Sequence, residues 1–291
     1  MMKTAAIVGS RSMLGAKLAS LLRARGVEVI SVGRSRDDDI LADLGLVPAI
    51  IPEIDLAADV LFHCAASFCG DDPTGHRQNL TVNGGSAGLV SEIAQKLGAK
   101  ALVYAGSAFS DKNAQENYGS YGFTKHLAEQ AFAALGPDIG FRFVSLRFSQ
   151  FYDTEGRCCA RQPWFGRIIA YASRGLDLRM PASLSARNFI HVEDAAEAMI
   201  RAAEEPVQGI IPISHPENLT SDELAVLAYD TFAAGGHPIV VPEKAPFRAF
   251  RFQDGAESLT ALALRPRSMR AGLGGIRDAG TAEAFGPMDV N

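Results

Sequence analysis

Tyr121 and Lys125 stand one helical turn apart in a segment whose apolar spacing predicts a helix. This spacing places the phenol and the ammonium group on the same helical face. A phenol exchanges protons near neutral pH only when its ordinary pKa of about 10 is lowered, and the charge of a nearby lysine lowers it. Ser107 ends an apolar run upstream and could hydrogen-bond the same substrate oxygen. We therefore predict that Ser107, Tyr121 and Lys125 form a catalytic trio.

A tyrosine–lysine pair of this kind is common on helices, so the surrounding sequence decides its meaning. Residues 9–15 lie between an expected strand and an expected helix, where backbone N–H groups can hold a dinucleotide pyrophosphate. A tight turn that needs glycines only for backbone geometry is the alternative. Ser12 replaces the middle glycine of G-x-x-G-x-x-G, so its side chain must point away from the pyrophosphate. We assign to the cofactor Gly9, Arg11, Ser12, Met13, Leu14 and Gly15.

The residues after the second expected strand bear on the type of dinucleotide. Arg34 and Ser35 stand there, without the carboxylate that would accept a hydrogen bond from a ribose 2′-hydroxyl. Arginine attracts a 2′-phosphate and can bind it bidentately, and Arg11 adds a second positive charge. These residues favour NADP over NAD as the cofactor. Three aspartates at 37–39 follow closely and leave NAD open.

The loop and the trio both follow apolar segments that alternate with amphipathic helical segments. We expect strands at 5–8, 27–32, 40–44, 60–64, 101–104 and 141–146, with helices among them at 14–22, 89–97 and 125–135. Near-continuous apolar strands that alternate with helices indicate an α/β fold, a doubly wound parallel sheet of the Rossmann type. In such sheets ligands bind beyond the carboxyl ends of the strands, which is where the candidate residues fall.

The alternation weakens beyond about residue 148. We expect helices at 164–172 and 194–203, and an irregular segment rich in Pro, Phe and basic residues at 235–252. The sequence thus predicts a dinucleotide-binding domain at 1–150. A smaller, irregular C-terminal substrate lobe is expected at 151–291, with a part of about 187–215 that returns to the first domain.

Composition excludes several classes of function. The chain has 291 residues and a formal net charge of −5, which gives no reason to bind nucleic acid or an anionic membrane. The N-terminal apolar run is too short for a signal peptide or a membrane span, so we expect a cytoplasmic protein. The four cysteines lack metal-ligand spacing and partner histidines, so we expect no metal site.

Several segments resemble one known family in the order in which they occur. They are Phe62-His63-Cys64-Ala65-Ala66, Asn83-Gly84-Gly85-Ser86, Tyr104-Ala105-Gly106-Ser107, Leu146-Arg147-Phe148 and, most specifically, the segment from Arg187 to Asp194. On these motifs the chain resembles the extended short-chain dehydrogenase/reductases, the NAD(P)-dependent epimerase/dehydratase family. The resemblance covers residues 3 to about 230, and the last sixty or so align poorly.

The resemblance implies an enzyme that acts on a nucleotide-diphosphate sugar. It places Arg187 near the substrate diphosphate, Ser107 and Ala108 near the sugar, and Tyr121 and Lys125 also against the cofactor. It further assigns to the cofactor Asp43, Leu44, Ala65 and Ala66, the alanines on the adenine and ribose side. His191 is expected to be a packed histidine. Family members are often homodimers through the helices around Lys125 and Leu89, so we expect a homodimer.

Within this family the glycine loop is similar to that of the GDP-fucose synthases, which are NADPH-dependent 4-keto-sugar reductases. The 4,6-dehydratases carry Thr-Asp-Glu where this chain has Ser107-Ala108-Phe109, which argues against dehydration. Ala108 also replaces the cysteine that serves the epimerisation steps of fucose synthases. We favour an NADPH-dependent 4-keto-sugar reductase. The alternatives are an NAD-dependent 4-epimerase, a reductase of a small ketone or aldehyde, and a non-catalytic dinucleotide-sensing regulator.

Overall fold

The computed structural model describes residues 2–47, 50, 53–113, 118–247, 249 and 251–288. The chain forms two compact units. The first contains Met1–Phe148, Ala195–Ile213 and Arg251–Leu264. The second contains Ser149–Asp194, Ser214–Phe250 and Arg265–Asn291, so that residues 187–194 belong to the second unit. The chain therefore passes between the units five times.

The first unit is built on a seven-stranded sheet of order β10-β6-β5-β4-β1-β2-β3. Its neighbouring strands are parallel, as the doubly wound fold requires. In chain order the strands are β1 (Thr4–Val8), β2 (Glu28–Gly33), β3 (Ile40–Leu41), β4 (Val60–His63), β5 (Ala101–Ser107), β6 (Arg142–Phe148) and β10 (Gly209–Ile213). The predicted fold class is confirmed.

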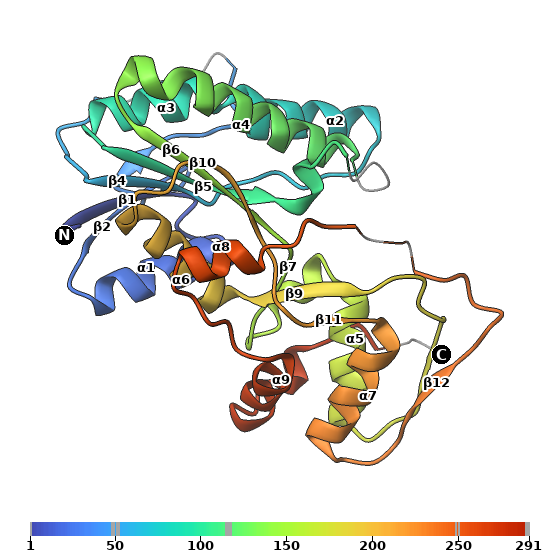
Figure 1. Ribbon diagram of the computed structural model, residues 1–291. Coiled ribbons are helices and arrows are strands. Elements are labelled where there is room, and N and C mark those ends of the chain that lie inside the picture. Colours follow the sequence, from blue (N-terminus) through green and yellow to red (C-terminus); the bar gives the residue numbers. More distant parts are fainter. Residues whose placement is uncertain are drawn as a thin grey trace. The chain divides into compact units, whose positions relative to one another are not determined.

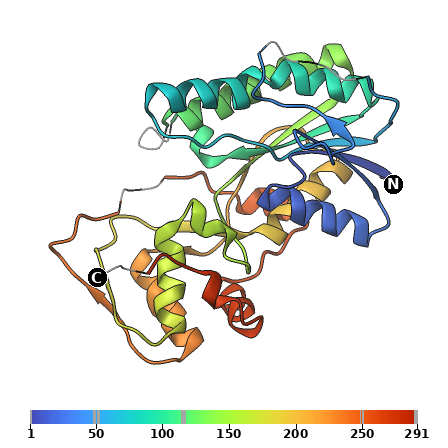
Figure 2. The same cartoon turned by 180° about the vertical axis from the view of Figure 1, so that it is seen from behind.

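Helices cover both faces of this sheet (Figure 1, Figure 2). One face carries α2 (Pro73–Asn79), α3 (Ala87–Lys96) and α4 (Ser120–Ile139). The other carries α1 (Met13–Ala24), α6 (Val192–Glu204) and α8 (Ala256–Ala261). The core beneath α3 and α4 joins apolar side chains of both helices to the sheet, among them Ile93, Phe132, Leu102 and Phe143. Burial of these faces removes the apolar stripe of each helix from water.

Two strands differ in length from the sequence expectation by three residues. The third strand spans only Ile40–Leu41, although 40–44 was expected. The fifth strand runs three residues beyond 104, because Ala105, Gly106 and Ser107 pair with β6. Because of this extension Ser107 is itself a paired residue of the sheet, which fixes the position of its backbone. Residues 80–85 (Leu80–Gly85, η1) form a π-helix between α2 and α3, which the sequence did not predict.

The second unit contains α5 (Pro163–Ser173), α7 (Ser221–Phe232) and α9 (Met269–Asp278). Its strands β7 (Gln150–Tyr152), β9 (Arg187–His191) and β11 (Asn218–Leu219) form a three-stranded sheet of order β11-β9-β7. The segment expected to be irregular at 235–252 contains β12 (Pro238–Val240), which pairs in parallel with β8 (Leu178–Met180). None of the helices within the described ranges is long and apolar enough to cross a membrane.

Candidate active site

The turn after β1 is shaped by two glycines. Gly9 has φ +80°, and a Cβ atom there would lie 2.8 Å from the backbone and side chain of Ala65. A Cβ on Gly15 would lie 2.2 Å from the Gly9 carbonyl oxygen. Both positions therefore require glycine, Gly9 for its left-handed φ and both for close approach. The turn lies against the chain that leaves β4, at the carboxyl edge of the sheet.

Ser12 is the N-cap of α1, and its Oγ accepts a hydrogen bond from the Gly15 N–H at 3.0 Å. The hydroxyl thus turns toward the helix, which is the orientation that a bound pyrophosphate would require. Met13 and Leu14 follow in the first helical turn, where backbone N–H groups have no partner within the helix. This cradle, which any larger residue at 9 or 15 would fill, fits a dinucleotide pyrophosphate.

The arginines assigned to the cofactor have different surroundings at the end of β2. Arg34 has an exposed side chain that forms no ion pair with the described residues. Arg11 pairs with two aspartates instead, at 3.5 Å from Asp37 and 3.4 Å from Asp38. The positive charge of Arg11 is therefore already balanced within the protein. Ser35 lies in the same turn, where its N–H donates to the Asp38 carboxylate at 2.9 Å.

The remaining cofactor candidates also follow strands of the sheet. Asp43 and Leu44 lie after β3, where the Asp43 carboxylate accepts from the Gly45 N–H at 2.8 Å and Leu44 is buried. Ala65 and Ala66 lie two and three residues after the end of β4; Ala65 contacts the glycine turn and Ala66 is exposed. The structure thus places these four residues at the carboxyl edge that also carries the glycine turn.

Lys125 is buried at 2% exposure in the second turn of α4. Its Nζ donates to the Ala105 carbonyl oxygen at 2.6 Å and lies 3.9 Å from the ring centroid of Tyr104. Burial lowers the pKa of Lys125 to about 7, although the charge of the Glu129 carboxylate opposes the change. The carbonyl fixes the ammonium group two residues before the end of β5.

Tyr121 lies one turn earlier on α4 and is half-buried. Its ring centroid is 4.4 Å from that of Phe68 and 6.2 Å from that of Phe109. Ser107 ends β5 with its side chain nearly buried, and its Oγ accepts from the Phe109 N–H at 3.2 Å. Because Phe109 contacts both Ser107 and Tyr121, the structure gathers the three predicted residues around the end of β5. Ala108 continues from Ser107 and is buried.

A buried pair of asparagines braces the chain before Tyr121. Asn79 accepts from the Ser67 hydroxyl at 2.9 Å and donates to the Ser120 hydroxyl at 3.1 Å. Asn83 accepts from the Ser67 N–H at 2.8 Å and donates to the Thr124 hydroxyl at 3.1 Å. These bonds tie the loop after β4 to the first turns of α4. No sequence pattern indicated Asn79, whereas Asn83 opens the segment Asn83-Gly84-Gly85-Ser86 of the family resemblance.

Two further groups near Lys125 were missed by the sequence analysis. His63 lies in β4 with its ring 5.1 Å from that of Tyr104, and burial lowers the pKa of His63 to about 3. Burial likewise raises the pKa of the Cys64 thiol to about 12. Both side chains are therefore uncharged at neutral pH. Phe68 was missed as well, because a single exposed phenylalanine in a loop gives no sequence pattern.

Arg187 belongs to the second unit, at the start of β9. Its guanidinium lies 5.6 Å from the ring centroid of Trp164, within the range of a cation–π contact. His191 ends the same strand and is buried, and its Nδ1 accepts from the Glu193 N–H at 3.2 Å, as a packed histidine does. Arg187 is thus held against an aromatic side chain of α5.

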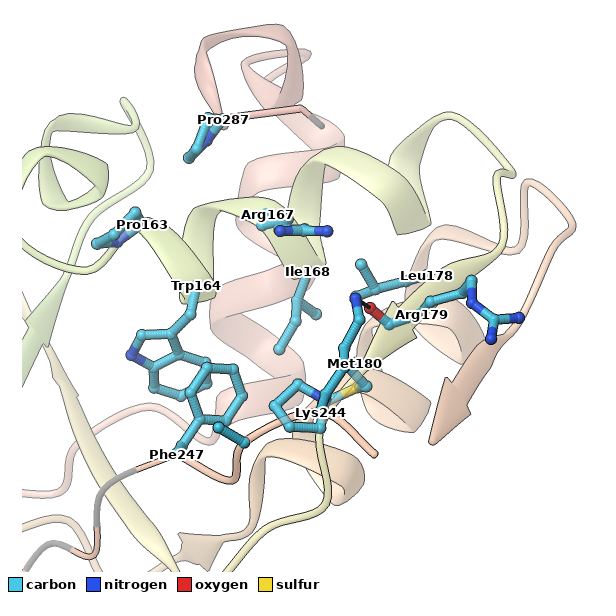
Figure 3. Close-up of a pocket in the computed structure, with 12 residues that line it drawn as sticks. Pro163, Trp164, Arg167, Ile168, Leu178, Arg179, Met180, Lys244, Phe247 and Pro287 are labelled. Carbon is cyan, nitrogen blue, oxygen red and sulfur yellow. Dashed lines mark hydrogen bonds between the residues drawn. The ribbon is translucent and has the colours of Figure 1, made fainter. Parts of the chain in front are cut away.

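Trp164 also lines a pocket of about 330 Å³ within the second unit (Figure 3). Trp164 and Phe247 form an aromatic wall, with ring centroids 5.4 Å apart. Arg167, Arg179 and Lys244 are also among the residues that line the pocket, and the Arg179 guanidinium is directed away from the two aromatic rings (Figure 3). The Lys244 Nζ donates to the Arg179 carbonyl oxygen at 2.8 Å. An apolar wall with cations around it suits a planar, negatively charged ligand.

The model of the NAD dependent epimerase/dehydratase family matches residues 5–214. No curated protein sequence matches the chain significantly. Solved structures match its fold over almost the whole length. The UDP-N-acetylglucosamine 4-epimerase from Bacillus cereus has a TM-score of 0.81 at 18% identity, covering 95% of this chain and 99% of that one.

Several of the similar solved structures contain a dinucleotide. The UDP-glucose 4-epimerase from Thermus thermophilus, in complex with NAD, has a TM-score of 0.69 at 18% identity, covering 96% of this chain and 99% of that one. RMD from Pseudomonas aeruginosa, in complex with NADPH, has a TM-score of 0.76 at 16% identity, covering 97% and 99%. At these identities the similarity shows a shared fold.

Proposed function

Because the chain belongs to the NAD dependent epimerase/dehydratase family, we propose that it transfers hydride between a nicotinamide dinucleotide and a carbon of a nucleotide-linked sugar. The observation that carries this proposal is the buried Lys125 ammonium group, held at the end of β5 one turn from Tyr121. The cradle at residues 9–15 supports it, since a dinucleotide pyrophosphate fits there. When bound, the nicotinamide supplies the hydride donor and acceptor.

The protein residues supply the proton chemistry. The phenolate oxygen of Tyr121 takes the proton from a sugar hydroxyl as the hydride leaves the sugar carbon for the nicotinamide, and the resulting phenol returns the proton when the carbonyl is reduced. The positive charge of Lys125 stabilises the phenolate form of Tyr121. The Ser107 hydroxyl donates a hydrogen bond to the same sugar oxygen and so stabilises the charge that develops there. Phe68 and Phe109 flank the Tyr121 ring and restrict its orientation.

The pocket of the second unit supports a nucleotide as part of the substrate. Trp164 and Phe247 offer an aromatic wall on which a base can stack, and Arg167 and Lys244 offer positive charge for phosphates. Its volume of about 330 Å³ lies within the range of roughly 300–1,000 Å³ that is usual for small-molecule sites. Arg187, beside Trp164, is our candidate for a diphosphate contact.

Two reactions use this machinery. In 4-epimerisation the sugar is oxidised and then reduced on its opposite face, so the dinucleotide ends in its starting state. In 4-keto reduction one reduced dinucleotide is consumed for each sugar. The neighbours named as 4-epimerases support epimerisation. The neighbour in complex with NADPH supports reduction. The experiment therefore has to separate them by the fate of the dinucleotide.

We would incubate the purified chain with UDP-glucose or UDP-N-acetylglucosamine plus NAD, and with a 4-keto nucleotide sugar plus NADPH. Proton NMR of the sugar and the absorbance of reduced nicotinamide are followed together. Formation of the 4-epimer without net absorbance change identifies an epimerase, and equimolar loss of NADPH identifies a reductase. Turnover only of small ketones or aldehydes would overturn the nucleotide-sugar proposal.

Tyr121→Phe is the decisive variant. It should lower kcat by about 10²–10⁴-fold, the usual contribution of a proton-transfer group, while dinucleotide binding persists. Tyr118→Phe is the matched control, because Tyr118 has no lysine one turn ahead and packs against Phe123 and His126. Dinucleotide binding with no turnover by the wild-type chain on any of these substrates would favour a sensing protein instead.

A further inference from the structure

A carboxylate lies against the last residue of β2, although residues 33–35 at the end of that strand include no acidic residue. Gly33 is the last residue of β2, and a Cβ atom on it would lie 2.5 Å from Oδ2 of Asp38. Asp38 comes from the next turn, in which its N–H donates to the Ser35 carbonyl oxygen at 3.0 Å. The Asp38 side chain thus folds back onto Gly33 and takes the space of a side chain at that position.

Asp38 already uses two of the three groups that the sequence suggested for a 2′-phosphate, namely Ser35 and Arg11. Its Oδ2 accepts from the Ser35 N–H at 2.9 Å, and its Oδ1 lies 3.4 Å from Nε of Arg11. The Asp38 side chain is only 4% exposed, whereas that of Arg11 is 58% exposed. A protein anion therefore occupies the place between Ser35 and Arg11 before any ligand binds.

The turn that carries Asp38 is itself fastened to β2. The Asp39 carboxylate accepts from both the N–H and the hydroxyl of Ser31, at 2.8 and 2.7 Å. The Ser31 hydroxyl in turn accepts from the Asp39 N–H at 2.9 Å. Since Asp39 is anchored on β2, Asp38 has little freedom to move away from Gly33.

A carboxylate at this position distinguishes the two dinucleotides. The ribose 2′-hydroxyl of NAD can donate a hydrogen bond to it, as to the acidic residue that usually ends this strand. The 2′-phosphate of NADP carries close to two negative charges near neutral pH, and the carboxylate repels it. It would also have to compete with Asp38 for the Ser35 N–H and for Arg11.

We propose that Asp38 is the residue that makes this chain select NAD over NADP. This inference rests on the proposed function only in that a nicotinamide dinucleotide binds at residues 9–15. It reverses the preference for NADP expected from Arg34 and Arg11 in the sequence. It also favours 4-epimerisation, in which the dinucleotide is recycled, over a reduction that consumes NADPH.

The test is calorimetric titration of the full chain with NADH and with NADPH, so that no turnover is needed. Wild type should bind NADH at least about tenfold more tightly, which corresponds to about 1.4 kcal/mol. Asp38→Asn keeps the size of the side chain and an acceptor for the Ser35 N–H, and it should reduce this ratio at least about tenfold. Tighter NADPH binding by wild type, or an unchanged ratio in Asp38→Asn, would overturn the proposal.

Two control variants separate Asp38 from its charged neighbours. Asp37→Asn removes an equal charge from an 83% exposed side chain that also pairs with Arg11, and it should change the ratio far less than Asp38→Asn. Arg34→Ala should leave the ratio unchanged; a selective loss of NADPH binding in this variant would restore the expectation from the sequence. Circular dichroism of each variant checks that it is folded.

The titration also separates this inference from the proposed function. A chain that prefers NADH but converts no nucleotide sugar contradicts the proposed function and leaves the role of Asp38 standing. A chain that converts nucleotide sugars but prefers NADPH contradicts only the role of Asp38. Failure to bind either dinucleotide contradicts both.

Discussion

Lys125 places a positive charge in a buried position, against a backbone carbonyl and an aromatic ring. Desolvation disfavours the charged form, which is why the pKa of Lys125 falls to about 7. In the unfolded chain the pKa of a lysine is about 10.4. Between these two values the unfolded state binds more protons than the native state. The free energy of unfolding therefore rises with pH in this window. It decreases again as the pH falls toward 7.

We expect Lys125→Met to remove this pH dependence. Between pH 7 and pH 9 the free energy of unfolding of wild type should rise by about 2 kcal/mol more than that of Lys125→Met. The reason is that each additional proton bound by the unfolded state changes this free energy by about 1.36 kcal/mol per pH unit. Guanidinium unfolding of both proteins at the two pH values measures the difference. Parallel pH dependence of the two proteins would mean that Lys125 titrates like an exposed lysine.

The chemistry of single residues was readable from the sequence only in part. Tyr121 and Lys125 could be paired because helical spacing alone fixes their relative positions. Asp38 could not be assigned, because its role depends on how a tight turn folds back onto Gly33. Residue type predicts which chemistry is available, whereas the direction of a side chain in a turn depends on hydrogen bonds such as those of Ser31 and Asp39.

At the scale of single elements, α1 depends on a cap that also shapes the glycine turn. The Ser12 hydroxyl accepts from the Gly15 N–H and so satisfies one of the unpaired donors of the helix start. The same hydroxyl stands where related loops carry glycine. The cap therefore explains how a serine can be accommodated next to a pyrophosphate.

Ser12→Ala should lower the free energy of unfolding by about 1 kcal/mol, because it removes the cap, and Ser12→Gly by only a few tenths. Dinucleotide binding should persist in Ser12→Gly, since glycine leaves the cradle open. Urea unfolding and calorimetric titration of both variants provide the measurements. Equal destabilisation by alanine and glycine would show that the hydroxyl contributes nothing as a cap.

The main helices and strands could be predicted because their apolar periodicity is long enough to be unambiguous. The elements that were missed are short or irregular. β12 has three residues and pairs with β8, far away in sequence, so nothing local indicates it. The position of α4 on the sheet also depends on a long-range contact, in which the buried Glu129 carboxylate accepts from Arg147 of β6 at 2.6 Å.

At the scale of the whole molecule, the exposed face of α4 bears on oligomerisation. Phe123 and Leu127 lie one turn apart on α4 with 49% and 38% of their surface exposed, and Leu80 of the neighbouring η1 is 47% exposed. Adjacent exposed apolar side chains of this size are typical of interaction surfaces. They support the homodimer that the family resemblance implied.

We expect the chain to be a dimer in solution, and Phe123→Glu to shift it to monomer by placing a charge in the apolar contact. Analytical ultracentrifugation at matched concentrations measures both. Val226→Glu is the control, because Val226 is 52% exposed on α7 of the other unit. A monomeric wild type, or a dimeric Phe123→Glu, would contradict an interface on this face.

The order of the strands also has a consequence for how the protein is made. β6 ends at Phe148, but its outer neighbour β10 begins only at Gly209. At a synthesis rate of about 5–20 residues per second, the ribosome needs roughly 3–12 s to add the segment between them. During that time the nascent chain presents the unpaired edge of an apolar strand, the feature through which unfinished sheets aggregate. Products of premature termination before Gly209 would keep that edge open permanently.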